Sequence, residues 1–94
     1  MTATTIAGNL AEFQRAGIRN IPDLRALIHL AGTKQATSTN LGLEIDVSPA
    51  TVTQLIDRLA LRGLVTRHQS ANDRRLVLAR ITPAGRELIT PFLP

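Results

Sequence analysis

The sequence predicts a mainly α-helical domain that carries a small β-hairpin, and three observations support this prediction. A chain of 94 residues is long enough for one domain and no more. Hydrophobic residues make up 44% of it, but tyrosine and tryptophan are absent and only two phenylalanines occur, so the expected core is aliphatic. Apolar residues recur at helical spacing over most of the chain, whereas one later segment alternates as a hairpin does.

The first two helices are predicted from their start and stop signals. Residues 7–17 are predicted to form a short helix. A second helix begins at Pro22, because proline suits the first helical turn and the neighbouring Asp23 complements the positive end of a helix. Its apolar positions run as far as Gly32, which is expected to end it, and they are Leu24, Leu27, Ile28 and Ala31. Residues 33–36 are expected to be a short connection.

A helix-turn-helix motif is predicted over residues 38–59. Thr37 or Ser38 caps its first helix. Two steeply crossing helices need a small residue where they touch, and Gly42 is placed at that point. Asp46 lies in the turn, because aspartate tolerates the left-handed conformation better than most residues. The shared core is expected to contain Leu41, Ile45, Val47, Val52 and Leu55.

The second helix of the motif, over about residues 48–63, is the predicted recognition helix. Ser48 can accept a hydrogen bond from a first-turn amide, and Pro49 occupies the first helical position, where its missing donor costs nothing. Gly63 is expected to stop the helix. Its apolar stripe consists of Val52, Leu55, Ile56 and Leu59.

A β-hairpin follows over about residues 64–81. Residues 64–69 and 76–81 are the predicted strands, and the turn-forming residues 70–73 join them. Two strands of one hairpin are not stable alone, so the hairpin must pack beside the helices. A last short helix, capped by Thr82, runs to Ile89. This order of elements predicts a single winged helix-turn-helix domain over residues 1–94.

The positive charge is concentrated in one third of the chain. Residues 48–80 contain six arginines and two acidic residues, whereas the rest contains five basic and five acidic residues, so the whole net charge of +4 lies in that segment. Such a concentration favours a polyanionic partner bound by one face. Single-stranded nucleic acid is less favoured, because its binding platforms stack bases on aromatic rings.

The recognition helix is expected to read base pairs in the major groove with the side opposite its apolar stripe. Gln54 is the best candidate for direct readout, because its amide can bond N6 and N7 of adenine together. Thr51 and Thr53 can contact phosphates or a thymine methyl group, and Arg58 can reach a phosphate or a guanine. The helix residues predicted to contact DNA are Ser48, Ala50, Thr51, Thr53, Gln54 and Arg58.

The hairpin is expected to act as a wing on the flanking minor groove. Its predicted contact residues are Arg67, His68, Arg74 and Arg75. An arginine suits a narrow, A·T-rich minor groove, where the negative potential is strongest. Asp73 is unsuited to DNA contact, and we expect it to hold an arginine or the turn backbone in place.

These residues resemble the MarR (multiple-antibiotic-resistance regulator) family. The resemblance covers about residues 21–89 and rests on the run VSPATVTQLIDRLALRGLVTR at 47–67, on Asp73-Arg74-Arg75 and on the closing ITPAG at 81–85. It implies a dimeric winged-helix regulator, most simply a repressor, on palindromic double-stranded DNA. By position it also implies that the helix acid Asp57 pairs with the wing arginine Arg75 and fixes the wing.

The same resemblance implies a long helix before this module and two after it, which build the dimer and a ligand pocket. About twenty residues precede the module here and few follow it. We therefore expect a compact member that is shortened at both ends and forms its homodimer differently. No residue pattern identifies a small-molecule effector.

A different class of function is a winged-helix module that binds another protein, with Leu43 and Leu61 as exposed contact residues. The basic helix and hairpin argue against it. No set of nucleophile, base and acid points to an enzyme, and with no cysteine and two histidines no metal or other cofactor is expected. The sequence has neither a signal peptide nor an apolar run of about 20 residues, so a cytoplasmic location without membrane contact is expected.

Overall fold

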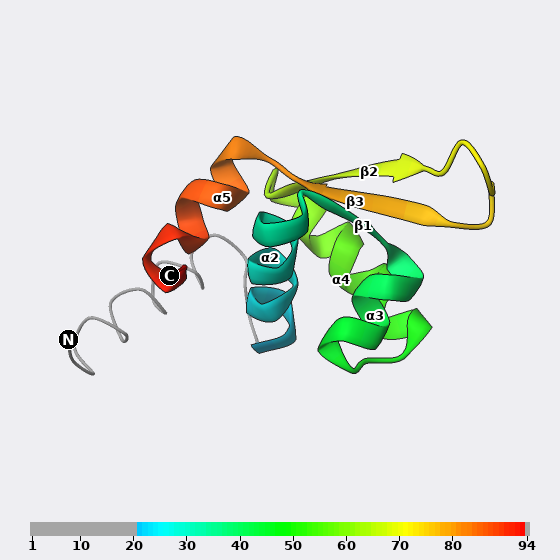
Figure 1. Cartoon of the computed structure of the whole chain (residues 1–94), viewed down its shortest axis with the longest axis horizontal. Coiled ribbons are helices and arrows are strands. Elements are labelled where there is room, and N and C mark those ends of the chain that lie inside the picture. Colours follow the sequence, from blue (N-terminus) through cyan, green and yellow to red (C-terminus); the bar gives the residue numbers. More distant parts are fainter. Residues whose placement is uncertain (1–20, 94) are drawn as a thin grey trace.

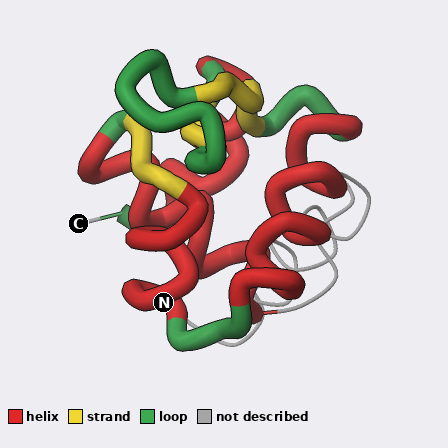
Figure 2. The backbone as a smooth tube through the Cα atoms, turned by 90° about the vertical axis from the view of Figure 1, so that its right-hand side faces the viewer, coloured by secondary structure: helices red, strands yellow, loops and turns green. Residues whose placement is uncertain are grey.

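The computed structural model describes residues 21–93, in which three helices pack against a small antiparallel sheet (Figure 1). Seen from the end of the hairpin, the strands and their loop lie above the layer of helices (Figure 2). The helix expected over residues 7–17 lies outside the described residues. In chain order the elements are α2 (Ile21–Thr33), β1 (Gln35–Thr37), α3 (Ser38–Ile45), α4 (Pro49–Leu61), β2 (Val65–Gln69), β3 (Val77–Ile81), α5 (Pro83–Ile89) and the 3₁₀ helix η1 (Thr90–Phe92).

Helix α2 runs past the residue that was expected to end it. Gly32 is still helical, and the chain leaves the helix at Lys34, whose φ is 72°. The Lys34 amide donates a hydrogen bond of 2.7 Å to the Leu30 carbonyl oxygen, which carries the last turn beyond Gly32. The prediction that Gly32 stops the helix is therefore wrong. Its core side consists of Ala26, Leu27, Leu30 and Ala31.

The segment expected to be a short connection contains a strand. Residues Gln35–Thr37 form β1, which pairs antiparallel with β3 so that Ala36 lies opposite Ala79. The sheet has the order β1-β3-β2, and β3 is its central strand. The prediction of a simple hairpin is corrected to a three-stranded sheet, because β1 gains its hydrogen bonds from residues more than forty positions further along the chain.

The helix-turn-helix is confirmed as helices α3 and α4. Thr37 caps α3, since its hydroxyl oxygen accepts a hydrogen bond from the Asn40 amide at 3.0 Å. Asp46 adopts the left-handed conformation with φ 59°. A Cβ atom added at Gly42 would lie 2.8 Å from Cγ2 of Val52, so only glycine lets the two helices approach this closely.

Helix α4 buries the predicted apolar stripe in the core. Val52, Leu55, Ile56 and Leu59 are each at most 1% exposed. The helix ends at Leu61, and Gly63 follows it with φ 75°. The same core receives Leu64 and Val65 at the start of the hairpin, and Ile89 of α5. Helices α2 and α3 contact the sheet as well, so α4 is one of three helices that pack against it.

The hairpin and the last helix join at the base of the sheet, the end far from the hairpin loop. Thr82 caps α5 by accepting a hydrogen bond of 3.0 Å from the Gly85 amide, and its own hydroxyl donates to the Gly63 carbonyl oxygen at 2.7 Å.

No helix of residues 21–93 is long and apolar enough to cross a membrane.

Candidate nucleic-acid interface

The N-terminal half of α4 presents short polar side chains to solvent. Ser48, Ala50, Thr51, Thr53 and Gln54 are all exposed. The Ser48 hydroxyl caps the helix by accepting a hydrogen bond from the Thr51 amide at 3.2 Å, and it donates to the Thr51 hydroxyl oxygen at 2.9 Å. The Thr53 hydroxyl donates to the Pro49 carbonyl oxygen at 3.1 Å. These bonds fix the two threonines and leave the Gln54 amide on the open face.

Arg58 lies on a different side of α4 from the one its predicted role requires. Its guanidinium donates to both carboxylate oxygens of Asp23, with Nη2 at 2.7 Å from Oδ1 and Nε at 3.4 Å from Oδ2. The Asp23 side chain is fully buried, so the ion pair ties α4 to α2 inside the domain. The expectation that Arg58 contacts DNA therefore does not fit this geometry, because its guanidinium is held against a fully buried carboxylate of α2.

Asp23 has a role that its place in the first turn of α2 does not by itself predict. It was assigned to the helix terminus, but it also lies three and four residues before Ala26 and Leu27, on the buried stripe of α2. An acid on such a stripe indicates a buried partner of opposite charge, because an unpaired buried charge is costly. That signal predicts a pair, although it does not identify Arg58.

A second ion pair joins α4 to the wing. Nη1 of Arg67 on β2 lies 2.6 Å from Oδ1 of Asp57 on α4. Both side chains are about half exposed, at 46% and 52% respectively. Asp57 thus does meet a wing arginine, but that arginine is Arg67, whereas the resemblance implied Arg75.

Arg75 instead pairs with Asp73 inside the loop of the wing. The Arg75 amide and Nε donate to Oδ1 of Asp73 at 3.0 and 3.1 Å, and Nη2 donates to Oδ2 at 3.2 Å. These hydrogen bonds from Arg75, the side chain first and then the backbone, lower the pKa of the Asp73 carboxyl below its usual 3.8. The loop is closed further by the Ser70 amide, which donates to the Leu76 carbonyl oxygen at 3.0 Å.

The wing places its four predicted contact residues in different positions. Side chains alternate between the faces of a strand, so Arg67 faces α4 and His68 lies on the other face, where its Nε2 is 2.8 Å from the Thr66 hydroxyl oxygen. Arg74 and Arg75 are exposed in the loop, and the Gln69 side chain holds the Arg74 carbonyl oxygen. Arg67 therefore lies beside α4, Arg74 and Arg75 are exposed in the loop of the hairpin, and His68 points away from α4.

The interface and the rest of the described residues do not meet the requirements of a metal site. Among residues 21–93 no group of three histidine, cysteine or acidic side chains could hold a metal ion. The surface consists of a capped helix with short polar side chains and an arginine-bearing hairpin fixed beside it. Such an arrangement is able to contact phosphates and base edges.

The comparison with family models decides the relationship. The model of the MarR family matches residues 20–77, which is more than half of the chain. The chain belongs to the MarR family. The match contains α2, the helix-turn-helix and the first strand of the wing.

Two helix-turn-helix regulators of Bacillus subtilis are similar to the chain over most of its length. The chain is 39% identical over 62 residues to YhbI, an uncharacterized HTH-type transcriptional regulator of Bacillus subtilis. This match covers 66% of this chain and 39% of YhbI. It is 32% identical over 68 residues to YetL, an HTH-type transcriptional repressor of the same organism, with 72% and 41% covered. The chain thus spans about two fifths of the length of these relatives.

Solved structures of the family share the fold. The MepR–DNA complex of Staphylococcus aureus superposes with a TM-score of 0.79 at 19% identity, and the match covers 96% of this chain and 74% of MepR. The structure of reduced AbfR bound to DNA gives 0.77 at 23% identity, with 89% and 58% covered. These similarities establish the winged helix-turn-helix architecture of this MarR-family chain.

Proposed function

We propose that this chain binds double-stranded DNA in a sequence-specific manner and regulates transcription as a repressor. Helix α4 would enter the major groove by its N-terminal half, and the loop of the wing would lie on the minor groove. The observation that carries the proposal is the Asp57–Arg67 ion pair, which joins the polar side of α4 and the arginine-bearing wing into one surface. Three of the six arginines between residues 48 and 80 belong to this wing, namely Arg67, Arg74 and Arg75.

Within this surface the proposed roles follow from position. Gln54 reads a base edge, and Ser48, Ala50, Thr51 and Thr53 approach the groove beside it. Arg74 and Arg75 contact phosphates or the minor groove, and Arg67 serves both Asp57 and the DNA. Asp57 and Asp73 keep the wing in shape. His68 stays a weaker candidate on the far face of the hairpin, and Arg58 serves the interior.

The proposed binding unit is a homodimer on a palindromic site, in the cytoplasm beside the DNA. One such module reads only a few base pairs, which is too little to specify a genomic site. The related YetL is named a transcriptional repressor, and MepR and AbfR were solved bound to DNA. Each relative supports the same type of function here.

Selection of bound fragments from a random pool of duplex DNA tests the proposal. We expect one recovered motif, arranged as two half-sites about one helical turn apart. On that site the affinity should fall with salt at a logarithmic slope of about −0.9 per phosphate contacted. DNA binding would be contradicted if no motif were recovered or if the affinity did not change with salt concentration. Either result would favour the protein-interaction module with Leu43 and Leu61.

The role of Gln54 is tested on the recovered site. Gln54→Ala should relax the preference at one base position by about 1–3 kcal/mol, whereas Arg74→Ala should weaken the binding of all DNA sequences about equally. Repeating the selection with each variant measures both effects. An unchanged motif with Gln54→Ala would overturn the readout role of this residue.

A further inference from the structure

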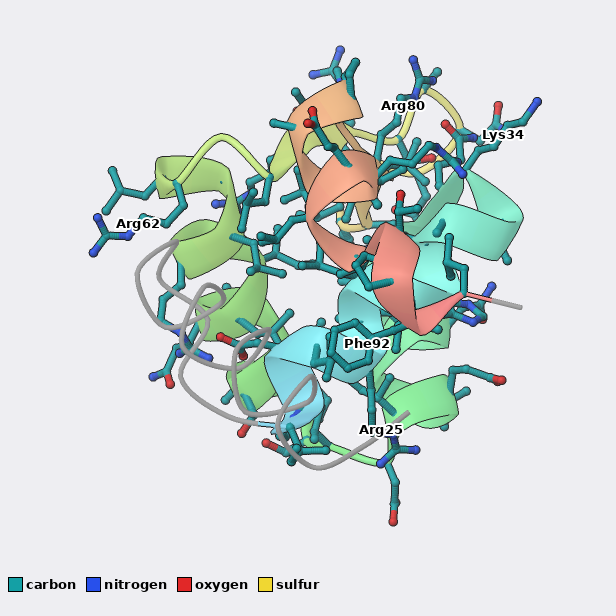
Figure 3. All side chains as sticks on the ribbon, turned by 90° about the vertical axis from the view of Figure 1, so that its left-hand side faces the viewer. Arg25, Lys34, Arg62, Arg80 and Phe92 are labelled. Carbon is teal, nitrogen blue, oxygen red and sulfur yellow. The ribbon has the colours of Figure 1, made fainter. Side chains whose placement is uncertain are left out.

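A group of three cations lies at the base of the sheet, outside the proposed DNA surface. Lys34 follows α2, Arg80 is the penultimate residue of β3, and Arg86 lies on α5. All three line one open hollow of about 320 Å³, together with Ile81, Thr82 and Pro83. Figure 3 shows Lys34 and Arg80 at the same end of the molecule, and Arg62 at the opposite side.

Within the hollow, Arg80 points to the side of the sheet that faces away from α4. Directly paired residues of antiparallel strands point to the same face. Arg67 faces Asp57 of α4 and is paired with the buried Ala79. Arg80 is the next residue along β3 and therefore points to the other face, where it is paired with Gln35 of β1. A ligand at Arg80 is thus separate from DNA held against α4.

Neutral acceptors hold the two arginines of the hollow in place. Nε and Nη2 of Arg80 donate to the Gln35 side-chain oxygen at 3.2 and 2.8 Å. Nη2 of Arg86 donates to the Ala31 carbonyl oxygen at 2.9 Å. These bonds orient each guanidinium without neutralising it, and each arginine keeps further N–H donors.

The backbone of Lys34 is fixed at the edge of the same hollow. Its amide donates to the Leu30 carbonyl oxygen at 2.7 Å, and its own carbonyl oxygen accepts from the Ile81 amide at 3.2 Å. The lysine side chain therefore begins from a defined point beside β3. No aspartate or glutamate of residues 21–93 lines the hollow, so its three positive charges are uncompensated there.

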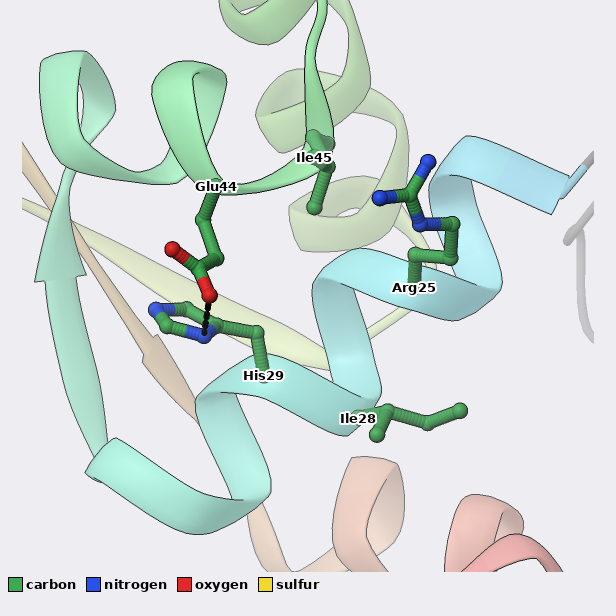
Figure 4. A pocket seen from close by; sticks show the side chains of 5 residues that line it. All are labelled: Arg25, Ile28, His29, Glu44 and Ile45. Carbon is green, nitrogen blue, oxygen red and sulfur yellow. Dashed lines mark ion pairs between the residues drawn. The ribbon is translucent and has the colours of Figure 1, made fainter.

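A second hollow shows what a compensated site looks like in this chain. It lies between α2 and α3 and is lined by Arg25, His29 and Glu44, among others. Nδ1 of His29 is 3.9 Å from a carboxylate oxygen of Glu44, and the arginine lies nearby (Figure 4). An anion entering there would meet a carboxylate. The hollow at the base of the sheet presents no such group.

We propose that the hollow formed by Lys34, Arg80 and Arg86 binds a small phosphate monoester. A phosphate dianion offers oxygen acceptors in the geometry that guanidinium groups prefer, and it balances more of the triple charge than a carboxylate does. Ile81 and Pro83 add an apolar wall for the organic part of the ligand. The volume lies at the lower end of the range for small-molecule sites, which suits a ligand of this size.

The test is a titration of the whole chain with phenyl phosphate and with inorganic phosphate, at constant ionic strength. We expect saturable shifts of the Lys34, Ile81 and Thr82 amide resonances, and tighter binding of the ester. Arg80→Gln and Lys34→Asn should each weaken binding at least fivefold, and asparagine keeps the left-handed backbone accessible. Arg62→Gln removes an exposed arginine elsewhere and should leave binding unchanged.

The outcomes distinguish a phosphate monoester site from nonspecific electrostatic attraction and from a contact with the DNA backbone. Shifts that do not saturate, or that Arg62→Gln reduces as much as Arg80→Gln does, would overturn the proposal. The phosphate group could also belong to a DNA backbone. In one outcome phenyl phosphate fails to bind while Arg80→Gln weakens the binding of duplex DNA and lowers the slope of its salt dependence by about 0.9. In that case the hollow is a DNA contact and the proposal is wrong. Saturable phenyl phosphate binding supports it even where no DNA motif is recovered.

Discussion

Helix α4 makes one ion pair on each side, and the two pairs have opposite surroundings. Toward α2, Arg58 meets an Asp23 whose side chain is 0% exposed. Toward the wing, Arg67 meets an Asp57 that is 52% exposed. The same two chemical groups therefore act in different ways. The inner pair is part of the folded core, whereas the outer pair lies in water and sets the position of the wing.

The largest expected effect is on stability, and it separates the two pairs. Asp23→Ala leaves Arg58 without its buried partner and should lower the free energy of unfolding by about 2–3 kcal/mol, below the usual cost for a buried pair because the arginine reaches water. Asp57→Ala should cost about 0.2–1 kcal/mol, as exposed pairs do. Urea unfolding followed by circular dichroism measures both. Equal losses would break the distinction.

The two arginines should differ in the same way toward DNA. Arg67→Ala removes an exposed cation of the proposed surface, and we expect about tenfold weaker binding and a salt slope reduced by about 0.9. Arg58→Gln keeps a hydrogen-bond donor toward Asp23 and should leave the slope unchanged. Fluorescence anisotropy on the selected duplex, at several salt concentrations, compares them. A reduced slope with Arg58→Gln would return that residue to the DNA surface.

High salt should affect the stability contributed by the two ion pairs to different extents, and this effect is smaller than the preceding ones. At about 1 M salt the screening length falls to about 3 Å, which weakens exposed pairs much more than buried ones. The stability difference between the unmodified chain and Asp57→Ala should then vanish, while that caused by Asp23→Ala should persist. Repeating the urea series in sodium chloride gives the result. Loss of both differences would mean that the Asp23 pair is open to solvent.

The smallest expected effect concerns the third pair, Asp73 with Arg75. Because the pKa of Asp73 is lowered in the folded state, its stabilising contribution is fully present above the unfolded value near 3.8 and is lost as the pH falls through the folded value. The Arg75 amide resonance should therefore move only below about pH 4. Asp73→Asn should abolish this shift in an NMR titration. A transition near neutral pH would point to another group.

The parts of the fold that were predictable from the sequence depend on short-range signals. The cap at Ser48, the proline beside it and the spacing of Val52, Leu55, Ile56 and Leu59 all lie within one segment, and α4 formed as expected. Gly42 was assigned correctly to the crossing of the helices for the same reason. Each of these signals is local and steric.

The parts that were missed depend on distant partners. Strand β1 has three residues and no alternating pattern, so only its register with β3 makes it a strand. The partner of Arg58 lies 35 residues earlier. Arg67 rather than Arg75 pairs with Asp57 because the strand register places Arg67 opposite the buried Ala79, on the face toward α4. Pairings of this type follow from the assembled fold rather than from spacing.

Thr37 is both the last residue of β1 and the cap of α3, so no loop separates the sheet from the helix-turn-helix. Its backbone completes the pairing with Leu78, while its hydroxyl oxygen accepts a hydrogen bond from the Asn40 amide in the first turn of the helix. A hinge needs residues whose dihedral angles are free to change, and this junction has none. The sheet and the first helix of the motif must therefore turn together, and any force applied to the wing is transmitted directly to the base of α3.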